Sequence, residues 1–148
     1  ALFDRSVSHA TELSQFNGED GFEGIIDCSK KCLANGIPVG LGTDTGCTYI
    51  THYDMWRELV YFHKYCGVSN KFALYTATKR NAEIAHIDNI TGTVEPGKCA
   101  DLIVTDANPI DDLKTLRNVK MVMARGHLIR EPKVKKYENV ERELDKFL

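Results

Sequence analysis

The chain has 148 residues, 43% of them hydrophobic, and a formal net charge of -2 at pH 7. This size and composition predict one compact globular domain with a hydrophobic core. The nearly balanced charge, without a basic stripe, argues against a nucleic-acid partner. No apolar run approaches the roughly 20 residues that cross a bilayer, and no signal-peptide pattern precedes Ala1. We therefore expect a cytoplasmic protein with no membrane partner.

The cysteines predict reduced thiols rather than a disulfide framework. They are odd in number and scattered along the sequence, as Cys28, Cys32, Cys47, Cys66 and Cys99. Cys28 and Cys32 could share one helix face and bind a metal ion, but neither a second pair nor a closing histidine follows at zinc-site spacing. We interpret the five cysteines as core thiols.

The chain begins with a predicted loop and a predicted helix. Residues 1–18 are polar and poorly periodic, which is typical of a loop. Apolar residues from Phe22 to Leu33 then recur with helical spacing. Gly36 is predicted to end this helix, and Pro38 forbids its continuation.

A short apolar segment then leads to a carboxylate. Residues 37–41 carry no charge, which is typical of a strand covered on both faces in a parallel α/β sheet. Such sheets place their chemistry at the carboxyl ends of the strands. Asp44 follows this segment between two glycines, Gly42 and Gly46, whose backbone lets a ligand approach closely. Asp44 is therefore a candidate catalytic residue, and the alternative is a strand-ending turn in which its carboxylate only accepts hydrogen bonds from backbone amides.

A second helix follows the Asp44 loop. Thr51 and Asp54 form a capping pattern, and apolar residues from Met55 to Cys66 then repeat at i, i+4, i+7 and i+11, up to Gly67. His52 lies in the predicted first turn of this helix, directly after the loop. We regard His52 as a candidate substrate-binding residue, because such loops carry function, and a solvent-exposed histidine at a helix start is the alternative.

The following residues change from helical to strand-like patterning. Ser69 is predicted to cap a helix over residues 70–78, and a second short helix is predicted over residues 79–85. Residues 92–97 predict a strand broken by a Pro-Gly turn. Residues 100–105 predict a short buried strand.

The last third of the chain predicts a hairpin and a helix. Asp111 or Asp112 is expected to cap one helical turn. Residues 119–124 are predicted to pair with residues 127–129 across a tight Arg-Gly turn. Residues 133–148 predict an amphipathic helix whose charges form a solvated face.

Four sets of motifs follow one another along the chain. They are GIPVGLGTDTG from Gly36 to Gly46, Arg57-Glu58-Leu59, Ala73-Leu74 with Ala77-Thr78 and Asn81-Ala82, and the run from Gly92 to Val104 that contains GTVEPGK and ADLIV. Together they resemble the C-terminal part of the amidohydrolase superfamily. Their order and the Gly-Thr-Asp-Thr-Gly loop are most similar to the branch of imidazolonepropionase-like enzymes and metal-dependent prolyl or arginyl dipeptidases. The resemblance extends roughly from Asp20 to Glu131.

The resemblance implies an α/β fold in which this chain is the C-terminal fragment of a (β/α)8 metal-dependent hydrolase barrel, with part of its composite β-sandwich. Residues 1–90 would be the last portion of the barrel, residues 91–131 the sandwich segment and residues 132–148 a C-terminal amphipathic helix. Asp44 would bind a divalent metal, for which the resemblance implies zinc, and would act as general base. The implied substrate is a small amide or dipeptide-like molecule.

The chain also departs from this pattern. It contains no His-x-His pair among its five histidines, and a (β/α)8 barrel takes ~250 residues. We therefore expect that this chain alone binds no metal and is inactive. Its expected partner is the missing N-terminal part of the barrel, or a second copy of the chain through self-association.

Two classes of function stay open. One is part of a hydrolase that cleaves an amide or peptide-like C–N bond, and the other is a non-enzymatic assembly module that uses the sandwich and the final helix.

Overall fold

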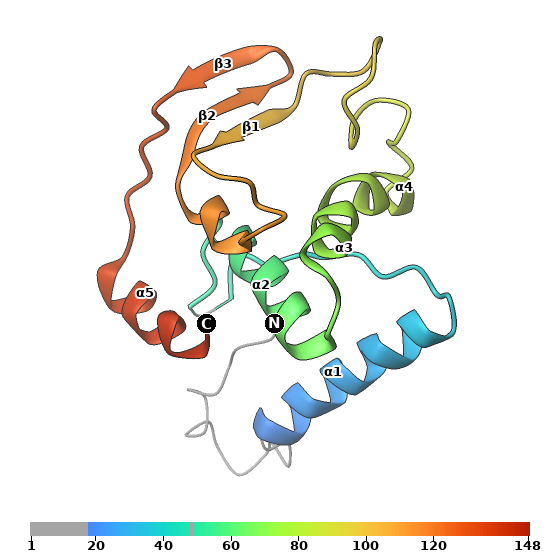
Figure 1. Ribbon diagram of the computed structural model, residues 1–148. Coiled ribbons are helices and arrows are strands. Elements are labelled where there is room, and N and C mark those ends of the chain that lie inside the picture. The colour runs from blue at the N-terminus through green and yellow to red at the C-terminus, as the bar shows by residue number, and fades with distance from the viewer. Residues whose placement is uncertain (1–17, 48) are drawn as a thin grey trace.

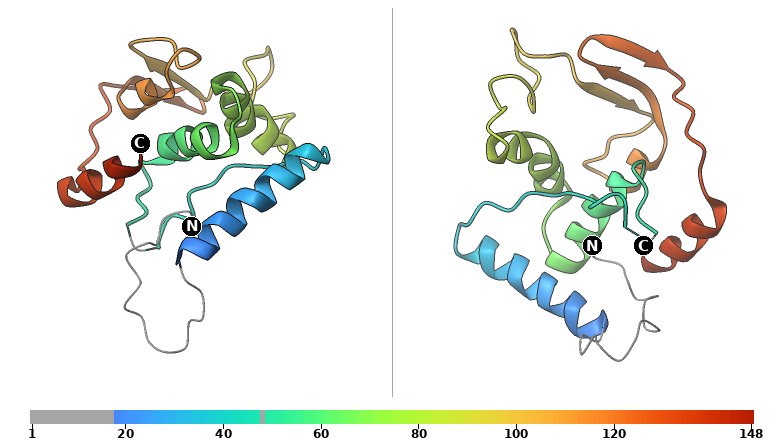
Figure 2. Two further views of the ribbon diagram at one scale, coloured as in Figure 1. Left: turned by 60° about the horizontal axis from the view of Figure 1, so that its bottom comes forward. Right: turned by 180° about the vertical axis from the view of Figure 1, so that it is seen from behind.

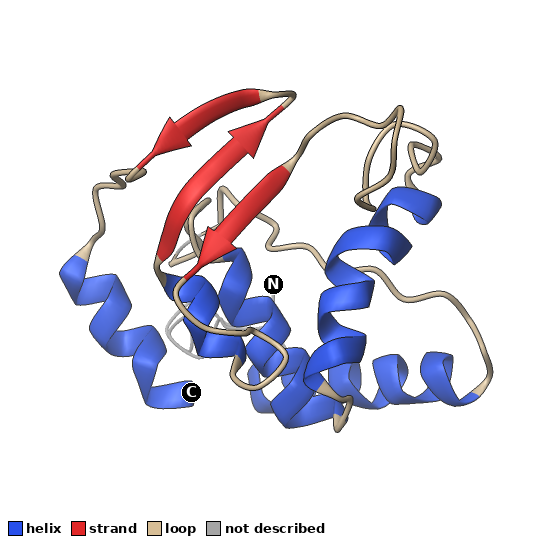
Figure 3. Cartoon of the chain, turned by 45° about the horizontal axis from the view of Figure 1, so that its top comes forward, coloured by secondary structure: helices blue, strands red, loops and turns tan. Residues whose placement is uncertain are grey.

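The computed structural model describes residues 18–47 and 49–148 and shows a mixed α/β arrangement. The predicted loop over residues 1–18 lies almost entirely outside the described residues. Figures 1 and 3 show a three-stranded sheet lying over one side of a helical layer, and Figure 2 shows α1 on the other side of that layer. The helices are α1 (Gly18–Ala34), α2 (Met55–Cys66), α3 (Asn70–Tyr75), α4 (Asn81–Ile84) and α5 (Glu138–Leu144). None of the helices in these ranges is long and apolar enough to span a membrane.

Helix α1 ends as the sequence predicts. Gly36 adopts φ 69°, and its N–H donates to the carbonyl of Leu33 at 3.1 Å. The N–H of Ile37 donates to the carbonyl of Cys32 at 2.9 Å. These two bonds form a Schellman motif, which satisfies carbonyls at the helix end and needs a residue that tolerates positive φ.

The prediction of a strand at residues 37–41 is wrong. Residues 37–43 run as an extended segment that has no strand partner among the described residues, and Ile37 is 54% exposed. Val39 and Leu41 are half-buried and pack against the core, whereas the alternate residues Gly40 and Gly42 are exposed. Only one face of the segment is therefore covered. A strand is completed by backbone hydrogen bonds to a neighbouring strand, and none of the described segments pairs with this one in that way.

Helix α2 lies at the centre of the molecule. Its bounds match the predicted helix, and Gly67 ends it with φ 74°. All residues from Trp56 to Phe62 are buried, so this part of the helix is covered on every side rather than on one apolar face. The main core cluster of the described residues combines this helix with its neighbours and consists of Trp56, Leu59, Val60, Phe62, Ala73 and Leu113.

The start of α2 differs from the prediction. The N-cap position is Asp54, which makes no capping hydrogen bond with its side chain. Thr51 instead donates from Oγ1 to Asp54 Oδ2 at 2.6 Å. His52 consequently lies in a turn before the helix and not in its first turn.

Helices α3 and α4 are parts of one continuous helical run, not two separate helices. Ser69 Oγ accepts from the N–H of Phe72 at 3.1 Å, which confirms the predicted cap. A π-helical turn, Thr76–Arg80, joins α3 to α4. The backbone N–H of Asn81 donates to the carbonyl of Thr76, as a π-turn requires.

The strands form one antiparallel sheet in the order β1 (Leu102–Thr105), β2 (Val119–Ala124) and β3 (His127–Arg130). The predicted hairpin is confirmed, and both residues of its Arg125-Gly126 turn have positive φ. Two other predictions for this region are wrong. Residues 92–97 form turns and bends without a strand, and β1 is exposed rather than buried. The described residues place no second layer on the outer face of this sheet.

The helix predicted over residues 133–148 is shorter than expected. Helix α5 starts only at Glu138, and a 3-10 turn, Asp145–Phe147, follows it. The N–H of Tyr137 donates to the hydroxyl of Tyr53 at 3.0 Å, with Tyr137 in an extended conformation. This tertiary contact holds the residue before α5 outside the helix.

The prediction of core thiols is wrong for three of the five cysteines. Cys28, Cys47 and Cys99 are exposed, whereas Cys32 and Cys66 are half-buried, and all five are free thiols as expected. Burial raises the pKa of the Cys66 thiol. The exposed cysteines lie on a helix surface and in loops, where sequence spacing does not determine burial.

Candidate functional site

Asp44 lies where the extended segment turns into a loop. Its backbone has φ 55°, an uncommon value for a residue other than glycine, and it turns the chain sharply. The thiol of Cys47 donates to Asp44 Oδ2 at 3.6 Å, and the Oγ1 atoms of Thr43 and Thr45 lie 2.6 Å apart. The carboxylate is exposed, and among the described residues its hydrogen-bond donor is this thiol and not a backbone amide. Among the described residues, no other group covers the carboxylate, which is accessible to a ligand.

The residues around Asp44 fit one ligand of a metal site but not a whole site. Within residues 18–47 and 49–148, no group of three or more His, Cys, Asp or Glu side chains could hold a metal ion. A catalytic zinc site usually has three protein ligands. Asp44 can supply one oxygen, and the remaining ligands would have to come from outside the described residues.

The side chain of Asn81 holds the segment that leads to Asp44. The N–H of Leu41 donates to Asn81 Oδ1 at 2.9 Å, and Asn81 Nδ2 donates to the carbonyl of Leu41 at 2.8 Å. Both polar groups of one backbone residue are thus satisfied by a single amide that lies 40 residues later. The sequence motif contained Asn81, but its spacing gave no sign of this contact.

His52 lies in a different environment from Asp44. Its exposed ring packs edge-on against Tyr53, with ring centroids 5.6 Å apart. It lines a cavity of about 700 Å³ between α2 and the sheet, together with Trp56 and Ile103. Asp44 does not line this cavity, so the structure does not bring the two candidate residues into one cavity. A role for His52 in substrate binding remains a prediction.

Sequence reasoning missed a buried carboxyl group on α2. Glu58 is 9% exposed and lines two cavities, of about 210 and 30 Å³. The larger one is also lined by Leu41 and the smaller one by Thr43, the residue before Asp44. Burial raises the pKa of Glu58 to about 7. The sequence gave little sign of this burial, because Glu58 becomes buried only when neighbouring elements cover this part of α2 on every side.

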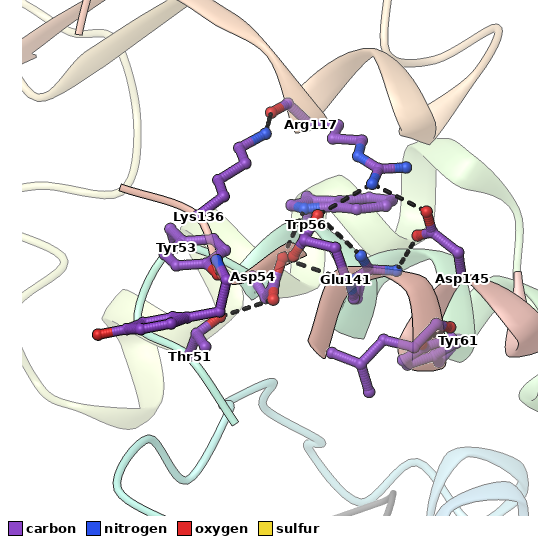
Figure 4. Close-up of polar contacts among 12 residues, drawn as sticks. Thr51, Tyr53, Asp54, Trp56, Tyr61, Arg117, Lys136, Glu141 and Asp145 are labelled. Carbon is purple, nitrogen blue, oxygen red and sulfur yellow. Dashed lines mark hydrogen bonds and ion pairs between the residues drawn. The ribbon is translucent and has the colours of Figure 1, made fainter. Parts of the chain in front are cut away.

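A cluster of charges joins α2 to the C-terminal helix (Figure 4). Arg57 is 2% exposed and donates to Asp145 Oδ1 at 2.7 Å and to Glu141 Oε2 at 3.1 Å. Arg117 donates to the same Glu141 oxygen and to Asp145 Oδ2, both at 2.9 Å. The two guanidinium groups lie 4.5 and 5.3 Å from the ring centroid of Trp56. The cluster fixes α5 against α2.

The same cluster fixes the chain between the Asp44 loop and α2. Asp54 Oδ1 accepts from Trp56 Nε1 at 3.1 Å and lies 3.3 Å from Arg57 Nε. Burial alone would raise the pKa of Asp145, but its hydrogen bonds and charge interactions with Arg117 and Arg57 hold that pKa below its usual value. Since each carboxylate has a cation beside it, we interpret this cluster as structural.

Comparison with known proteins decides the family of the chain. The model of the amidohydrolase family matches residues 23–129, which is most of the chain. The chain belongs to the amidohydrolase family. The resemblance seen in the sequence motifs is therefore confirmed.

Curated amidohydrolase relatives match over short stretches. The imidazolonepropionase of Picrophilus torridus is 47% identical over 53 residues, which are 36% of this chain and 13% of that protein. The 5-methylthioadenosine/S-adenosylhomocysteine deaminase of Dictyoglomus thermophilum is 40% identical over 89 residues, which are 53% of this chain and 20% of that protein. The amidohydrolase chain thus spans a small part of these relatives.

Solved structures match the amidohydrolase chain over more of its length. A Bifidobacterium longum protein assigned as a prolidase superposes with a TM-score of 0.89 at 36% identity, over 98% of this chain and 36% of that one. A Xaa-Pro dipeptidase with methionine in its active site superposes with a TM-score of 0.69 at 33% identity, over 76% of this chain and 27% of that one. The chain therefore spans about a third of the length of these proteins.

Proposed function

We propose that this amidohydrolase-family chain is the C-terminal part of a metal-dependent hydrolase that cleaves a C–N bond in a small amide or dipeptide-like substrate. The family match supports the hydrolase class. The two structures at 36 and 33% identity, named as a prolidase and a Xaa-Pro dipeptidase, favour dipeptides that end in proline as the first substrates to test.

In this proposal, residues 1–90 form the last portion of a (β/α)8 barrel, residues 91–131 part of a β-sandwich, and residues 132–148 the C-terminal helix. The uncovered face of residues 37–44 and the exposed apolar strand β1 are the surfaces against which the rest of the enzyme would pack. A second copy of the chain is the alternative partner for the same surfaces.

The observation that carries the proposal is the position of Asp44. Its carboxylate is exposed at the end of an extended segment that is covered on one face only. A divalent cation, for which we propose zinc, would polarise the scissile carbonyl and activate water at such a site. Asp44 would supply one oxygen ligand, accept a proton on its carboxylate from the attacking water, and donate that proton to the leaving nitrogen.

The test is Asp44→Asn in the complete enzyme, assayed for turnover of Xaa-Pro dipeptides and for bound metal. The amide keeps the shape of the side chain but loses the base and the charge, so we expect turnover to fall about 10²- to 10⁴-fold. Asp106→Asn is the matched control, because Asp106 is an exposed carboxylate that pairs with Lys120 beside the sheet. Wild-type turnover in Asp44→Asn would refute the assignment. A complete protein with neither metal nor hydrolysis would favour the assembly module instead.

A further inference from the structure

We propose that Asn81 is a positioning residue that fixes the extended segment before Asp44 and thereby sets the place of the Asp44 carboxylate. The catalytic meaning of this inference rests on the proposed function. The contact itself does not, and it can be tested separately.

The first argument is the pair of hydrogen bonds between Asn81 and Leu41. A residue in a strand needs one acceptor for its N–H and one donor for its carbonyl, which a neighbouring strand normally supplies. The Asn81 amide offers both, with its oxygen 2.9 Å from the Leu41 nitrogen and its nitrogen 2.8 Å from the Leu41 oxygen. Among the described residues, Asn81 is the one whose side chain hydrogen-bonds to both the N–H and the carbonyl of Leu41.

The second argument is the fit between this amide and Gly40. A Cβ atom added to Gly40 would lie 2.8 Å from Asn81 Oδ1 and 3.2 Å from Ile84 Cδ1. The first distance is too short for a carbon–oxygen contact, so any larger residue at position 40 would displace the amide or the segment. The backbone and the amide are therefore matched to each other.

The third argument is the irregular turn that precedes Asn81. The π-turn at Thr76–Arg80 adds one residue to the helical run, and one residue corresponds to about 100° of rotation around a helix axis. Without this extra residue, the side chain of Asn81 would point away from the helix axis in another direction. Such π-turns recur at functional sites, and here the turn aims one side chain at Leu41.

The fourth argument is the short distance along the chain from Leu41 to Asp44. Two residues separate them, Gly42 and Thr43, and both are in the extended segment. A displacement of about 1 Å at a reacting group can cost roughly 10²-fold in rate. Holding Leu41 by both of its backbone groups is therefore a direct way to hold Asp44.

The structural test is hydrogen exchange of the Leu41 amide in the complete protein. Asn81→Ala removes both hydrogen bonds, and we expect Leu41 to exchange about tenfold faster or more. Asn81→Asp keeps the acceptor but loses the donor, so its effect should be intermediate. Asn70→Ala is the matched control, because Asn70 also donates to backbone carbonyls, those of Ile110 and Asp111, but at another place. Unchanged exchange at Leu41 in Asn81→Ala would overturn the inference.

The functional test compares kcat and KM of the complete enzyme. Asn81→Ala should lower kcat about 10- to 100-fold with little change in KM, since it misplaces the base rather than the substrate. In an Asp44→Asn background, the same substitution should lower kcat little further, because Asn81 acts through Asp44. Unchanged kcat in Asn81→Ala, or full additivity with Asp44→Asn, would refute a positioning role.

The two tests separate the two possible failures. A wild-type protein without hydrolase activity would overturn the proposed function and with it the catalytic role of Asn81, whereas the exchange of Leu41 would still support or overturn the contact. Faster exchange at Leu41 together with a lower kcat supports the whole inference.

Discussion

The buried carboxyl group of Glu58 should make the stability of the protein depend on pH. Its pKa is about 7 in the folded chain against an ordinary value of 4.5, because burial disfavours the charged form. The folded state therefore holds this proton more tightly than the unfolded state. The free energy of unfolding should fall as pH rises from about 4.5 to 7 and then level off. At 1.36 kcal/mol per pKa unit, the loss is about 3 kcal/mol.

Replacing Glu58 by Gln tests this expectation, because the amide stays neutral. Glu58→Gln should be more stable than the wild type by up to about 3 kcal/mol at pH 8 and no more stable near pH 4. The measurement is urea denaturation at several pH values, followed by the fluorescence of Trp56, the single tryptophan of the chain. Glu138→Gln, at an exposed position of α5, is the matched control. The reasoning would be refuted if Glu58→Gln did not raise the free energy of unfolding at pH 8, or raised it most at acid pH.

Further predictions concern the charge cluster, a close backbone contact and the chain in isolation. Arg57→Ala should lower the free energy of unfolding by about 3–5 kcal/mol in urea denaturation, because it leaves Glu141 buried without that partner. The lowered pKa of Asp145 means that its ion pairs stabilise the fold above its ordinary pKa of 3.8 and are lost as pH falls through its lower folded value; far-ultraviolet circular dichroism below pH 3.8 should therefore show loss of helix. Gly92→Ala should destabilise by at least about 1–3 kcal/mol, measured as a lower Tm, since its Cβ would lie 2.5 Å from that of Ala82 at φ 92°. The isolated chain should be inactive, bind no stoichiometric zinc after rinsing with chelator and self-associate in light scattering, and an active, zinc-loaded monomer would contradict all three.

Features that depend on a few neighbouring residues could be predicted from the sequence. The end of α2 at Gly67, the cap at Ser69 and the hairpin turn at Arg125-Gly126 are all where the local pattern put them. In each case, the determining contacts join residues within a few positions of one another. The same is true of the loop around Asp44, which the sequence identified by its glycines.

Features that depend on distant parts of the chain could not be predicted in this way. The pairing of residues 37–41 requires neighbours that the described chain does not supply, and the burial of Glu58 requires several elements around α2. The role of Asn81 depends on a π-turn and on a segment 40 residues earlier. Periodicity reports which face of an element is apolar, but it does not report which element will cover that face.

The contact between Cys47 and Asp44 makes the candidate site accessible to chemical labelling. An alkylating reagent attached to the exposed Cys47 sulfur would lie beside the Asp44 carboxylate, since the two side chains are 3.6 Å apart. A ligand bound to Asp44 would in turn shield this thiol. Once the other exposed cysteines, Cys28 and Cys99, are replaced by serine, protection of Cys47 from alkylation would report occupancy of the site without any need for turnover.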